Sequence, residues 1–378
     1  MALVKPDSGR FAQIKVLGIG GGGGNCINTM VETDQIEGVD FVAINTDAQA
    51  LLNNKAPAKL QIGKKLTKGL GAGGNPQIGQ KAAEESREEI KRLITGSDMV
   101  FLTGGEGGGT CTGAAPMIAA IAKELKILTV AVVTKPFNFE GHRRATTATE
   151  GIDKLREKVD TLITIPNQKL LDTINKKITL IEAFHLVDSV LISGVQGIAD
   201  LITKPGLINL DFADVKMIMK NAGNTLMGIG KASGENRATK AARLATASPL
   251  LETSIEGAKG ILFNIVGSKD LTMKEVEEAA EAIFSQADPD ANIIFGATVD
   301  ESLNNKIKIT LIAAGFDEKR RLAKIAKAAS ETSQGIIKEI PPESQEEKTT
   351  PKEIAPEDLG EEYEIPTFLR QGKKKLIN

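Results

Sequence analysis

Two glycine-rich stretches near the start of the chain have the residue types that bind phosphate groups. The first is Gly20–Asn25, with five consecutive glycines, and the second is Gly107–Gly113, in which Thr110 and Thr112 add hydroxyl donors. Each follows an apolar run typical of a buried strand and precedes a segment typical of a helix. Such a turn directs free backbone N–H groups and the positive end of a helix dipole at one point, where anions bind. We therefore expect two phosphate-binding turns rather than flexible surface loops.

A third glycine-rich segment, Gly69–Pro76, contains Ala72, Gly73 and Gly74 and leads into a charged helix expected from Gln77 to Thr95. Three such turns are more than a pyrophosphate needs, and they suit a nucleoside triphosphate. The glycine pattern from Gly18 to Gly23 also satisfies the dinucleotide-binding fingerprint, but consecutive glycines satisfy almost any glycine pattern. A dinucleotide-binding oxidoreductase is therefore the less favoured alternative.

Polar residues follow the predicted strand at residues 39–44, where side chains line the ligand crevice of a parallel sheet. Asn45 and Asp47 lie there, and they suit contacts to a nucleotide or to its metal. The alternative for both is an Asx turn or a cap of the helix that follows.

Two later strand ends also carry polar residues. Glu140 and Arg144 follow the predicted strand at residues 127–133, and the carboxylate suits ribose hydroxyls while the guanidinium suits a phosphate or the sugar. Their alternative is a solvated surface charge. Asn167 follows the predicted strand at residues 161–165, where it either reads a base edge or caps the next helix.

Three carboxylates further along are candidates for chemistry. Asp188 lies in a long apolar helix predicted at residues 179–203, so we expect it to be buried and to need donors such as those of guanine. Asp211 and Asp214 lie three residues apart at a helix start. They either cap the helix or form an ionised pair that orients a water or a metal.

The alternation of predicted strands and helices predicts an α/β fold with a Rossmann-type, doubly wound parallel sheet in the first half. Strands at 261–266, 292–299 and 307–314, with a helix at 274–287, indicate a second α/β domain without a nucleotide cradle. The predicted organisation is a flexible arm (1–10), a nucleotide-binding domain (11–178), the central helix (179–203), a loop with its following helix (204–221), the second domain (222–316), a linker that is partly helical and then disordered (317–362), and an apolar peptide with a basic end (363–378).

Composition limits the possible partners. A formal net charge of −2 over 378 residues gives no electrostatic reason to expect nucleic acid. Two cysteines fit a reducing compartment, and the two histidines provide no metal-binding cluster. We find no signal peptide and no apolar run of membrane-spanning length. The apolar peptide Tyr363–Gln371, followed by Lys373–Lys375, is expected to dock on a partner protein.

Together, these motifs resemble the tubulin/FtsZ family of GTPases. The sequence GGGTCTG at Gly107–Gly113 is similar to the family's signature loop GGGTGTG, and Tyr363–Gln371 is similar to its C-terminal peptide. Further similar segments are Gly20–Asn25, Asn45–Asp47, Gly71–Pro76, Pro136–Arg144 and Asn209–Lys216. The resemblance implies a tubulin-like fold and a GTPase that polymerises head to tail into the filaments of the bacterial division ring. It implies GTP or GDP with Mg²⁺ bound through the phosphates, a cytoplasmic location, and adaptor proteins at the membrane that bind the C-terminal peptide.

The resemblance also implies roles for individual residues. Asn209, Asp211 and Asp214 would act on the GTP of the neighbouring subunit, so that hydrolysis requires assembly. The GTP-binding residues would be Gly20, Gly21, Gly22, Gly23, Gly24, Asn25, Asn45, Asp47, Ala72, Gly73, Gly74, Gly107, Gly108, Gly109, Thr110, Cys111, Thr112, Gly113, Glu140, Arg144, Asn167, Phe184 and Asp188.

Three residues depart from the family pattern. Cys111 replaces a glycine, and we expect its side chain to crowd the phosphates. A thiol beside a helix N-terminus is also expected to have a lowered pKa, so that its alkylation blocks GTP binding and GTP protects it. Glu106 replaces an apolar residue, and it either faces away from the phosphates or helps to hold a cation. Gly74 replaces an alanine, which should loosen its loop. Because of Cys111, a tubulin-like GTP-binding scaffold with weak hydrolysis is an alternative.

Overall fold

The computed structural model describes residues 12–33, 36–173, 178–204, 206–208, 210–248, 255 and 257–316. The predicted arm, linker and C-terminal peptide, and Asn209, lie outside the described residues. The strands are β1 (Ile14–Ile19), β2 (Val39–Asn45), β3 (Ala58–Gln61), β4 (Met99–Gly105), β5 (Leu128–Lys135), β6 (Thr161–Pro166), β7 (Gly223–Ser233), β8 (Gly260–Gly267), β9 (Asn292–Val299) and β10 (Lys306–Ala314).

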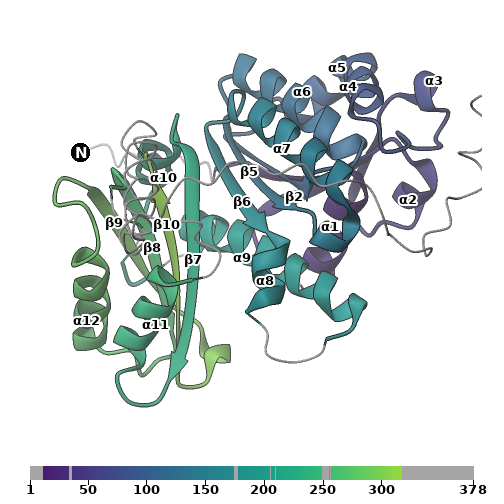
Figure 1. The fold of residues 1–378 in the computed structure, drawn as a ribbon. Helices are drawn as coiled ribbons and strands as arrows, with labels where there is room; N and C mark the ends of the chain where they lie inside the picture. Colours follow the sequence, from purple (N-terminus) through teal and green to yellow (C-terminus); the bar gives the residue numbers. More distant parts are fainter. Residues whose placement is uncertain are drawn as a thin grey trace, which may run out of the picture. The chain divides into compact units, whose positions relative to one another are not determined.

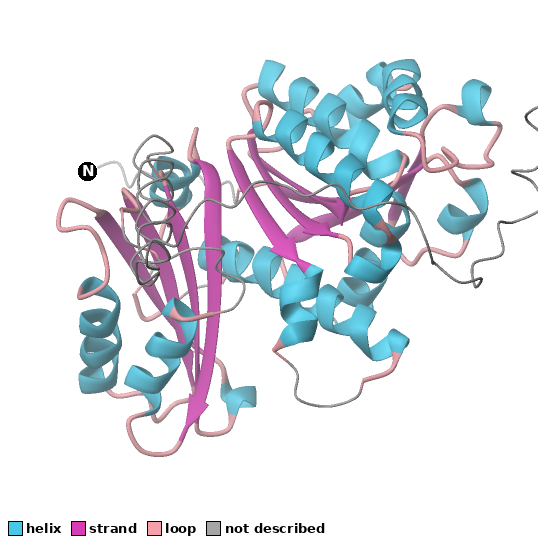
Figure 2. Cartoon of the chain, viewed as in Figure 1, coloured by secondary structure: helices cyan, strands magenta, loops and turns pink. Residues whose placement is uncertain are grey.

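Helices connect most of these strands, as Figure 2 shows. The α-helices are α1 (Gly20–Thr33), α2 (Ala48–Leu52), α3 (Lys64–Thr67), α4 (Pro76–Glu85), α5 (Arg87–Ile94), α6 (Thr110–Glu124), α7 (His142–Arg156), α8 (Asn167–Asp172), α9 (Leu180–Thr203), α10 (Phe212–Met219), α11 (Arg237–Thr246) and α12 (Met273–Phe284). Two 3₁₀ turns, η1 (Asn138–Glu140) and η2 (Glu301–Leu303), complete the described elements.

The strands form one sheet in the order β3-β2-β1-β4-β5-β6-β7-β10-β8-β9. Every pair from β3 to β7 is parallel, whereas β10 is antiparallel to both of its neighbours. The predicted α/β fold with a Rossmann-type first half is therefore confirmed. The strand β7 connects the two halves, because Gly223–Thr225 pair with β6 and Leu226–Ser233 pair with β10.

Both faces of the sheet are buried, because neighbouring residues of a strand point to opposite faces. Val16 and Phe101 belong to the core that α1, α9 and α10 cover, while Leu17 and Leu102 belong to the core that α4 to α7 cover. Figure 1 shows α11 and α12 next to each other beside the strands β7, β10 and β8, where they cover a third core. The rigid layers fix the carboxyl ends of β1, β4, β5 and β6 at one edge of the sheet.

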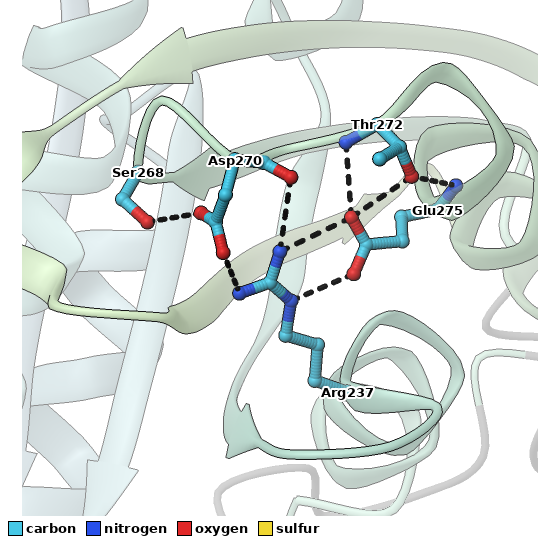
Figure 3. Close-up of polar contacts among 5 residues, drawn as sticks. All are labelled: Arg237, Ser268, Asp270, Thr272 and Glu275. Carbon is cyan, nitrogen blue, oxygen red and sulfur yellow. Dashed lines mark hydrogen bonds and ion pairs between the residues drawn. The ribbon is translucent and has the colours of Figure 1, made fainter.

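The start of α11 is attached to the following βα turn by a network around Arg237 (Figure 3). Arg237 is 8% exposed, and its guanidinium donates to both carboxylate oxygens of Glu275 at 2.7 and 3.2 Å and to the Asp270 carboxylate at 2.6 Å. Glu275 also accepts from the N–H of Thr272, the N-cap of α12. The planar fork of arginine thus connects the two helices that cover this half of the sheet.

One predicted helix, Gln77 to Thr95, is two helices in the structure. The break falls at Ser86, which is buried, and its hydroxyl accepts the N–H of Gly63 at 3.1 Å. A serine that bonds to a distant backbone group in this way competes with continuation of the helix.

The central helix α9 begins one residue later than predicted, with Thr179 as its N-cap. Its apolar residues run nearly all round the helix, which predicts burial between two layers, but its first turn is exposed: Leu180 and Ile181 are 60% and 69% exposed. By length and composition α9 could cross a membrane, which corrects the expectation that no run was long enough. Half of its most apolar window is buried inside the protein, and a core helix passes the same test.

Candidate nucleotide-binding site

The two predicted phosphate-binding turns meet at the edge of the sheet. β1 pairs in parallel with β4, so that α1 and α6 begin beside each other at the carboxyl ends of these strands. A Cβ built at Gly22 would lie 3.2 Å from the backbone nitrogen of Gly105. The N-cap of α6 is Gly109, which provides no side-chain cap, so the first N–H groups of this helix are available to an anion.

A pocket of about 320 Å³ opens at this point. It brings together thirteen of the predicted GTP-binding residues, which come from five separate segments of the chain. They are Gly20, Gly21, Gly22, Asn25, Gly108, Gly109, Thr110, Cys111, Glu140, Arg144, Asn167, Phe184 and Asp188. The glycine turns thus share one cavity with the polar residues of later strand ends and of α9.

Asn167 and Asp188 line this pocket from α8 and α9. Asn167 is 4% exposed, and its Oδ1 has no hydrogen-bond partner among the described residues. Burial raises the pKa of Asp188 to about 6, while the nearby His185 lowers it. A buried acceptor without a donor is costly, so Asn167 calls for a ligand that brings N–H donors. The Asp188 carboxylate, which is half-buried rather than buried as predicted, is a second acceptor in the same pocket.

Three phenylalanines form an aromatic group near these acceptors. The rings of Phe137 and Phe139 stack with centroids 5.1 Å apart, and Phe184 meets Phe137 edge-on at 5.6 Å. Phe184 lines the pocket and is 43% exposed. An exposed ring beside N–H acceptors suits a purine base.

Glu140 and Arg144 form an ion pair at 3.0 Å in another part of the pocket lining. The Glu140 carboxylate also accepts the N–H of Phe137 at 2.8 Å, which fixes it beyond the end of β5. Both residues line the pocket, so neither is merely a solvated charge.

Two predicted contacts at the end of β2 have structural partners instead. Asp47 is the N-cap of α2 and accepts from the N–H groups of Gln49 and Ala50. Asn45 is 7% exposed and accepts the N–H of Thr46 at 2.8 Å. Neither lines the main pocket; Asn45 and Gly24 line a neighbouring pocket of about 180 Å³.

Some of the remaining predicted residues shape the turns without lining the main pocket. A Cβ at Gly113 would lie 2.0 Å from the carbonyl oxygen of Pro76, so this glycine permits α4 and α6 to touch. Gly23 approaches the carbonyl of Thr103 in the same way. These two glycines therefore serve the close packing of the turns rather than direct contact with a ligand.

The other predicted residues outside the main pocket lie in the two later glycine segments. Gly107 has φ +92°, and its N–H donates to the Thr112 hydroxyl at 2.9 Å, so both residues hold the signature turn together. The loop residues Gly73 and Gly74 have open space around them, whereas Ala72 is buried.

Cys111 does not behave as predicted. Its side chain is 4% exposed and belongs to the core of α4 to α7, and its Sγ lies 2.5 Å from a Cβ built at Gly104. The thiol therefore points into the core beneath the turn rather than at the phosphates. Burial and the adjacent Glu106 raise the pKa of this thiol well above the usual value. The prediction of a lowered pKa and a reactive thiolate is therefore wrong.

Asp211 and Asp214 lie at the start of α10 and do not line the pocket. Each carboxylate accepts the other residue's N–H, at 2.9 and 3.2 Å, in a capping box. Within one chain, Asp211 and Asp214 therefore cap the helix, which was one of the two predicted alternatives. Asp211 is exposed and Asp214 is half-buried, so both carboxylates lie at the surface, where a second role is open to them.

Sequence reasoning missed several pocket residues. Val187 and Leu191 add apolar surface on the face of α9 that carries Phe184 and Asp188, and the helical spacing of these residues is a signal that was available. Thr134 and Pro136 line the pocket at the end of β5, and Gly105 at the end of β4. Glu106, which the sequence singled out as a departure from the family pattern, also lines the pocket.

One pocket of this α/β fold thus contains two glycine-rich helix N-termini and two acceptors that suit a base. These features are typical of nucleotide-binding proteins. Comparisons with known proteins narrow this class. Residues 13–175 match the GTPase domain of the tubulin/FtsZ family, and residues 223–317 match the C-terminal domain of the FtsZ family. The chain belongs to the tubulin/FtsZ family of GTPases, and the tubulin-like fold predicted from the sequence is confirmed.

Solved structures agree with this assignment. An empty FtsZ dimer from M. jannaschii is 51% identical, with a TM-score of 0.78, over 81% of this chain and 89% of its own. A tryptophan-to-tyrosine mutant of FtsZ from M. jannaschii has the same identity and TM-score, over 81% of this chain and 92% of its own. CetZ1 from Haloferax volcanii, a GDP-bound monomer, is 22% identical with a TM-score of 0.70, over 85% of this chain and 99% of its own, and shares the fold alone.

Proposed function

We propose that this chain binds GTP in the pocket at the edge of the sheet. The observation that carries the proposal is the buried, unpartnered Oδ1 of Asn167 in the same pocket as the Asp188 carboxylate. Guanine brings an N–H group and an amino group on one edge, which together match two acceptors. The triphosphate would then extend to the N-termini of α1 and α6, with the glycine turns against its oxygens.

Mg²⁺ is part of this proposal. Among the described residues, no three histidine, cysteine or acidic side chains are grouped so that they could hold a metal ion. The ion would therefore be held through the GTP phosphates, where it offsets their negative charge. Glu140 and Arg144 would contact the ribose and the phosphates.

We further propose that hydrolysis takes place between two copies of the chain. Among the described residues that line the pocket, the acidic ones are Glu106, Glu140 and Asp188; the last two are assigned to the sugar and the base, and Glu106 is buried. Asp211 and Asp214, with Asn209, would orient the attacking water from the next subunit of a head-to-tail filament. Phosphoryl transfer depends on positioning and charge stabilisation, so an added carboxylate pair can complete a site.

The proposed cellular role is the filament of the division ring, in the cytoplasm. Residues 11–178 would serve as the GTP-binding domain and 222–316 as the supporting domain, ranges close to those of the two family matches. The C-terminal peptide Tyr363–Gln371 would bind adaptor proteins at the membrane.

The test is the GTP hydrolysis rate as a function of protein concentration. A shared site predicts a threshold concentration, below which turnover is negligible. A rate strictly proportional to protein concentration would contradict it and would favour a scaffold with weak hydrolysis in each monomer.

A mixing experiment sharpens this test. Asp214→Ala keeps the pocket and loses the carboxylate, while Asn167→Ala with Asp188→Ala loses the pocket and keeps the carboxylate. Each alone should be inactive, and their mixture should regain part of the activity, because some interfaces combine an intact pocket with an intact Asp214. Asp290→Ala, a change at an exposed acidic residue, is the control and should retain full turnover.

A further inference from the structure

Glu106 is a buried carboxylate directly beneath the phosphate-binding turn. It is the first residue after β4, its side chain is 1% exposed, and it lines the pocket beside Gly105 and Gly108. Its N–H donates to the carbonyl of Thr134 at 3.0 Å, which fixes the backbone at this point. The carboxylate is thus held close to the place where the nucleotide phosphates would lie.

Few donors stabilise the charge of this carboxylate. Oε1 accepts from the Sγ of Cys111 at 3.6 Å, and Oε2 has no hydrogen-bond partner among the described residues. A Cβ built at Gly151 of α7 would lie 2.7 Å from Oε2, so the helix packs against this oxygen through a bare glycine. An ionised carboxylate in such surroundings is poorly stabilised.

The described elements packed against Glu106 carry few charges. α6 contributes the neutral thiol of Cys111 and the hydroxyl of Thr112, and α7 contributes Gly151. Arg144, earlier on α7, places its aliphatic part and carbonyl near Gly107 and directs its guanidinium to Glu140 at 3.0 Å. Lys135 stands at the end of β5, after Thr134.

These surroundings bring the carboxylate close to its neutral state at physiological pH. Burial raises the pKa of Glu106 to about 7, against the opposing effect of the nearby Thr112 hydroxyl and Cys111 thiol. A nucleoside triphosphate in the adjacent pocket adds negative charge. A nearby like charge disfavours the ionised form further.

We propose that Glu106 takes up one proton from solvent when the chain binds a nucleoside triphosphate, so that GTP affinity falls as the pH rises. This inference rests on the proposed function, since it requires GTP in this pocket. The proton comes from hydronium or a buffer acid in solution: the O–H or N–H bond of that donor breaks as the O–H bond of the carboxylic acid forms, and the conjugate base stays in solution. At low pH the group is already neutral and its contribution to binding is independent of pH; at high pH each binding event must first protonate it.

Glu106→Gln tests this directly, because glutamine has the shape of the neutral acid and does not titrate. The dissociation constant of GTP is measured between about pH 6 and pH 8.5, a range that spans the titration of Glu106. The wild type should lose affinity above pH 7, by at most about tenfold per pH unit, since one proton is involved. Glu106→Gln should keep its affinity above pH 7, where the wild type loses it.

A matched control is Glu150→Gln, an exposed residue on α7, which should follow the wild type. Titration of the terminal phosphate, near pH ~6, is common to all variants and cancels in their ratio. Cys111→Ala removes a donor to the ionised carboxylate, and it should move the loss of affinity to higher pH. Parallel pH profiles for the wild type and Glu106→Gln would overturn the proposal.

Calorimetry gives a second measurement that needs no variant. Titrations of the wild type with GTP near pH ~7.5, in two buffers of different ionisation enthalpy, report the protons taken up. The proposal expects uptake of a fraction of one proton, and zero uptake overturns it even if Glu106→Gln does not fold. Absence of GTP binding at every pH would instead refute the proposed function.

Discussion

Asp211 and Asp214 cap each other: Asp211 Oδ1 accepts the N–H of Asp214 at 2.9 Å, and Asp214 Oδ2 accepts the N–H of Asp211 at 3.2 Å. This reciprocal arrangement fixes two carboxylates at the N-terminus of α10, the positive end of the helix dipole. The structural role and the proposed catalytic role therefore coincide in the same pair, and substitutions must be chosen to separate them.

Asp214→Asn is the substitution that separates the two roles. The amide oxygen still accepts the N–H of Asp211, so we expect the unfolding free energy to change by less than about 0.5 kcal/mol. GTP turnover should fall by at least about 100-fold, because the negative charge that positions water is lost. Asp211→Ala, which removes the cap, should cost about 1 kcal/mol in chemical denaturation. Unchanged turnover in Asp214→Asn would disprove the proposed role.

Asp188→Asn should change the preferred base from guanine to xanthine. Guanine carries an amino group where xanthine carries an oxygen, so an ionised carboxylate suits guanine and an amide donor suits xanthine. We expect GTP affinity to fall by about 10- to 100-fold, as for the loss of a charged hydrogen bond, while affinity for xanthosine triphosphate rises. Competition binding with both nucleotides checks this. Equal losses for both would indicate that Asp188 does not contact the base.

GTP affinity should also fall in acid. The raised pKa of Asp188, about 6 in the free protein, becomes lower once donors of the base stabilise the ionised form. The affinity gained from this ionisation is present above pH 6 and is lost as the pH falls below that value. Fluorescent-nucleotide titrations below and above pH 6 measure this loss, and Asp188→Asn serves as the reference without it. A wild type insensitive to acid would contradict the assignment.

Both cysteines should react slowly with alkylating agents in the native protein. Cys26 and Cys111 are 0% and 4% exposed, and burial raises the pKa of both thiols. Labelling therefore requires local opening, and we expect it to be at least about 100-fold slower than in denaturant. Mass spectrometry over time gives both rates. Rapid labelling of Cys111 that GTP suppresses would restore the original expectation from the sequence.

Arg237→Lys should destabilise the half of the protein that α11 and α12 cover. Lysine keeps the charge but cannot donate to Glu275 through two nitrogens and to Asp270 through a third. We expect a loss of about 2 kcal/mol of unfolding free energy, the scale of charged hydrogen bonds, with Arg237→Met at least as severe. Arg243→Met, at an exposed position of the same helix, is the matched control. Equal stability of the two methionine variants would show that the network contributes little.

The sequence was most informative where local chemistry decides the structure. Glycines between an apolar strand and a helix predicted the turns at Gly20 and Gly109, because a glycine-rich turn between a buried strand and a helix is typical of an anion-binding site. The same reasoning placed Asn167 at the end of a strand. The structure shows in addition that its Oδ1 is buried and has no hydrogen-bond partner among the described residues. Parallel strands bring their carboxyl ends together, so these segments meet without any further information.

Properties that depend on distant packing were not predictable in this way. The direction of the Cys111 side chain depends on the space beneath the turn, next to Gly104. The burial of Glu106 depends on Gly151, which lies on a later helix. The stack of Phe137 and Phe139 against Phe184 joins segments that are more than forty residues apart in the chain. In each case the deciding contact comes from packing that no local pattern encodes.

The strand β7 has a mechanical consequence. It is attached to β6 through three residue pairs, from Gly223 to Thr225, but to β10 through eight pairs, from Leu226 to Ser233. Tension applied across the sheet would therefore separate β6 from β7 before it separated β7 from β10. The weaker of these two strand pairings involves β6, the strand that leads into Asn167. Tension along a filament of such subunits would therefore act first next to the part of the pocket that contains Asn167.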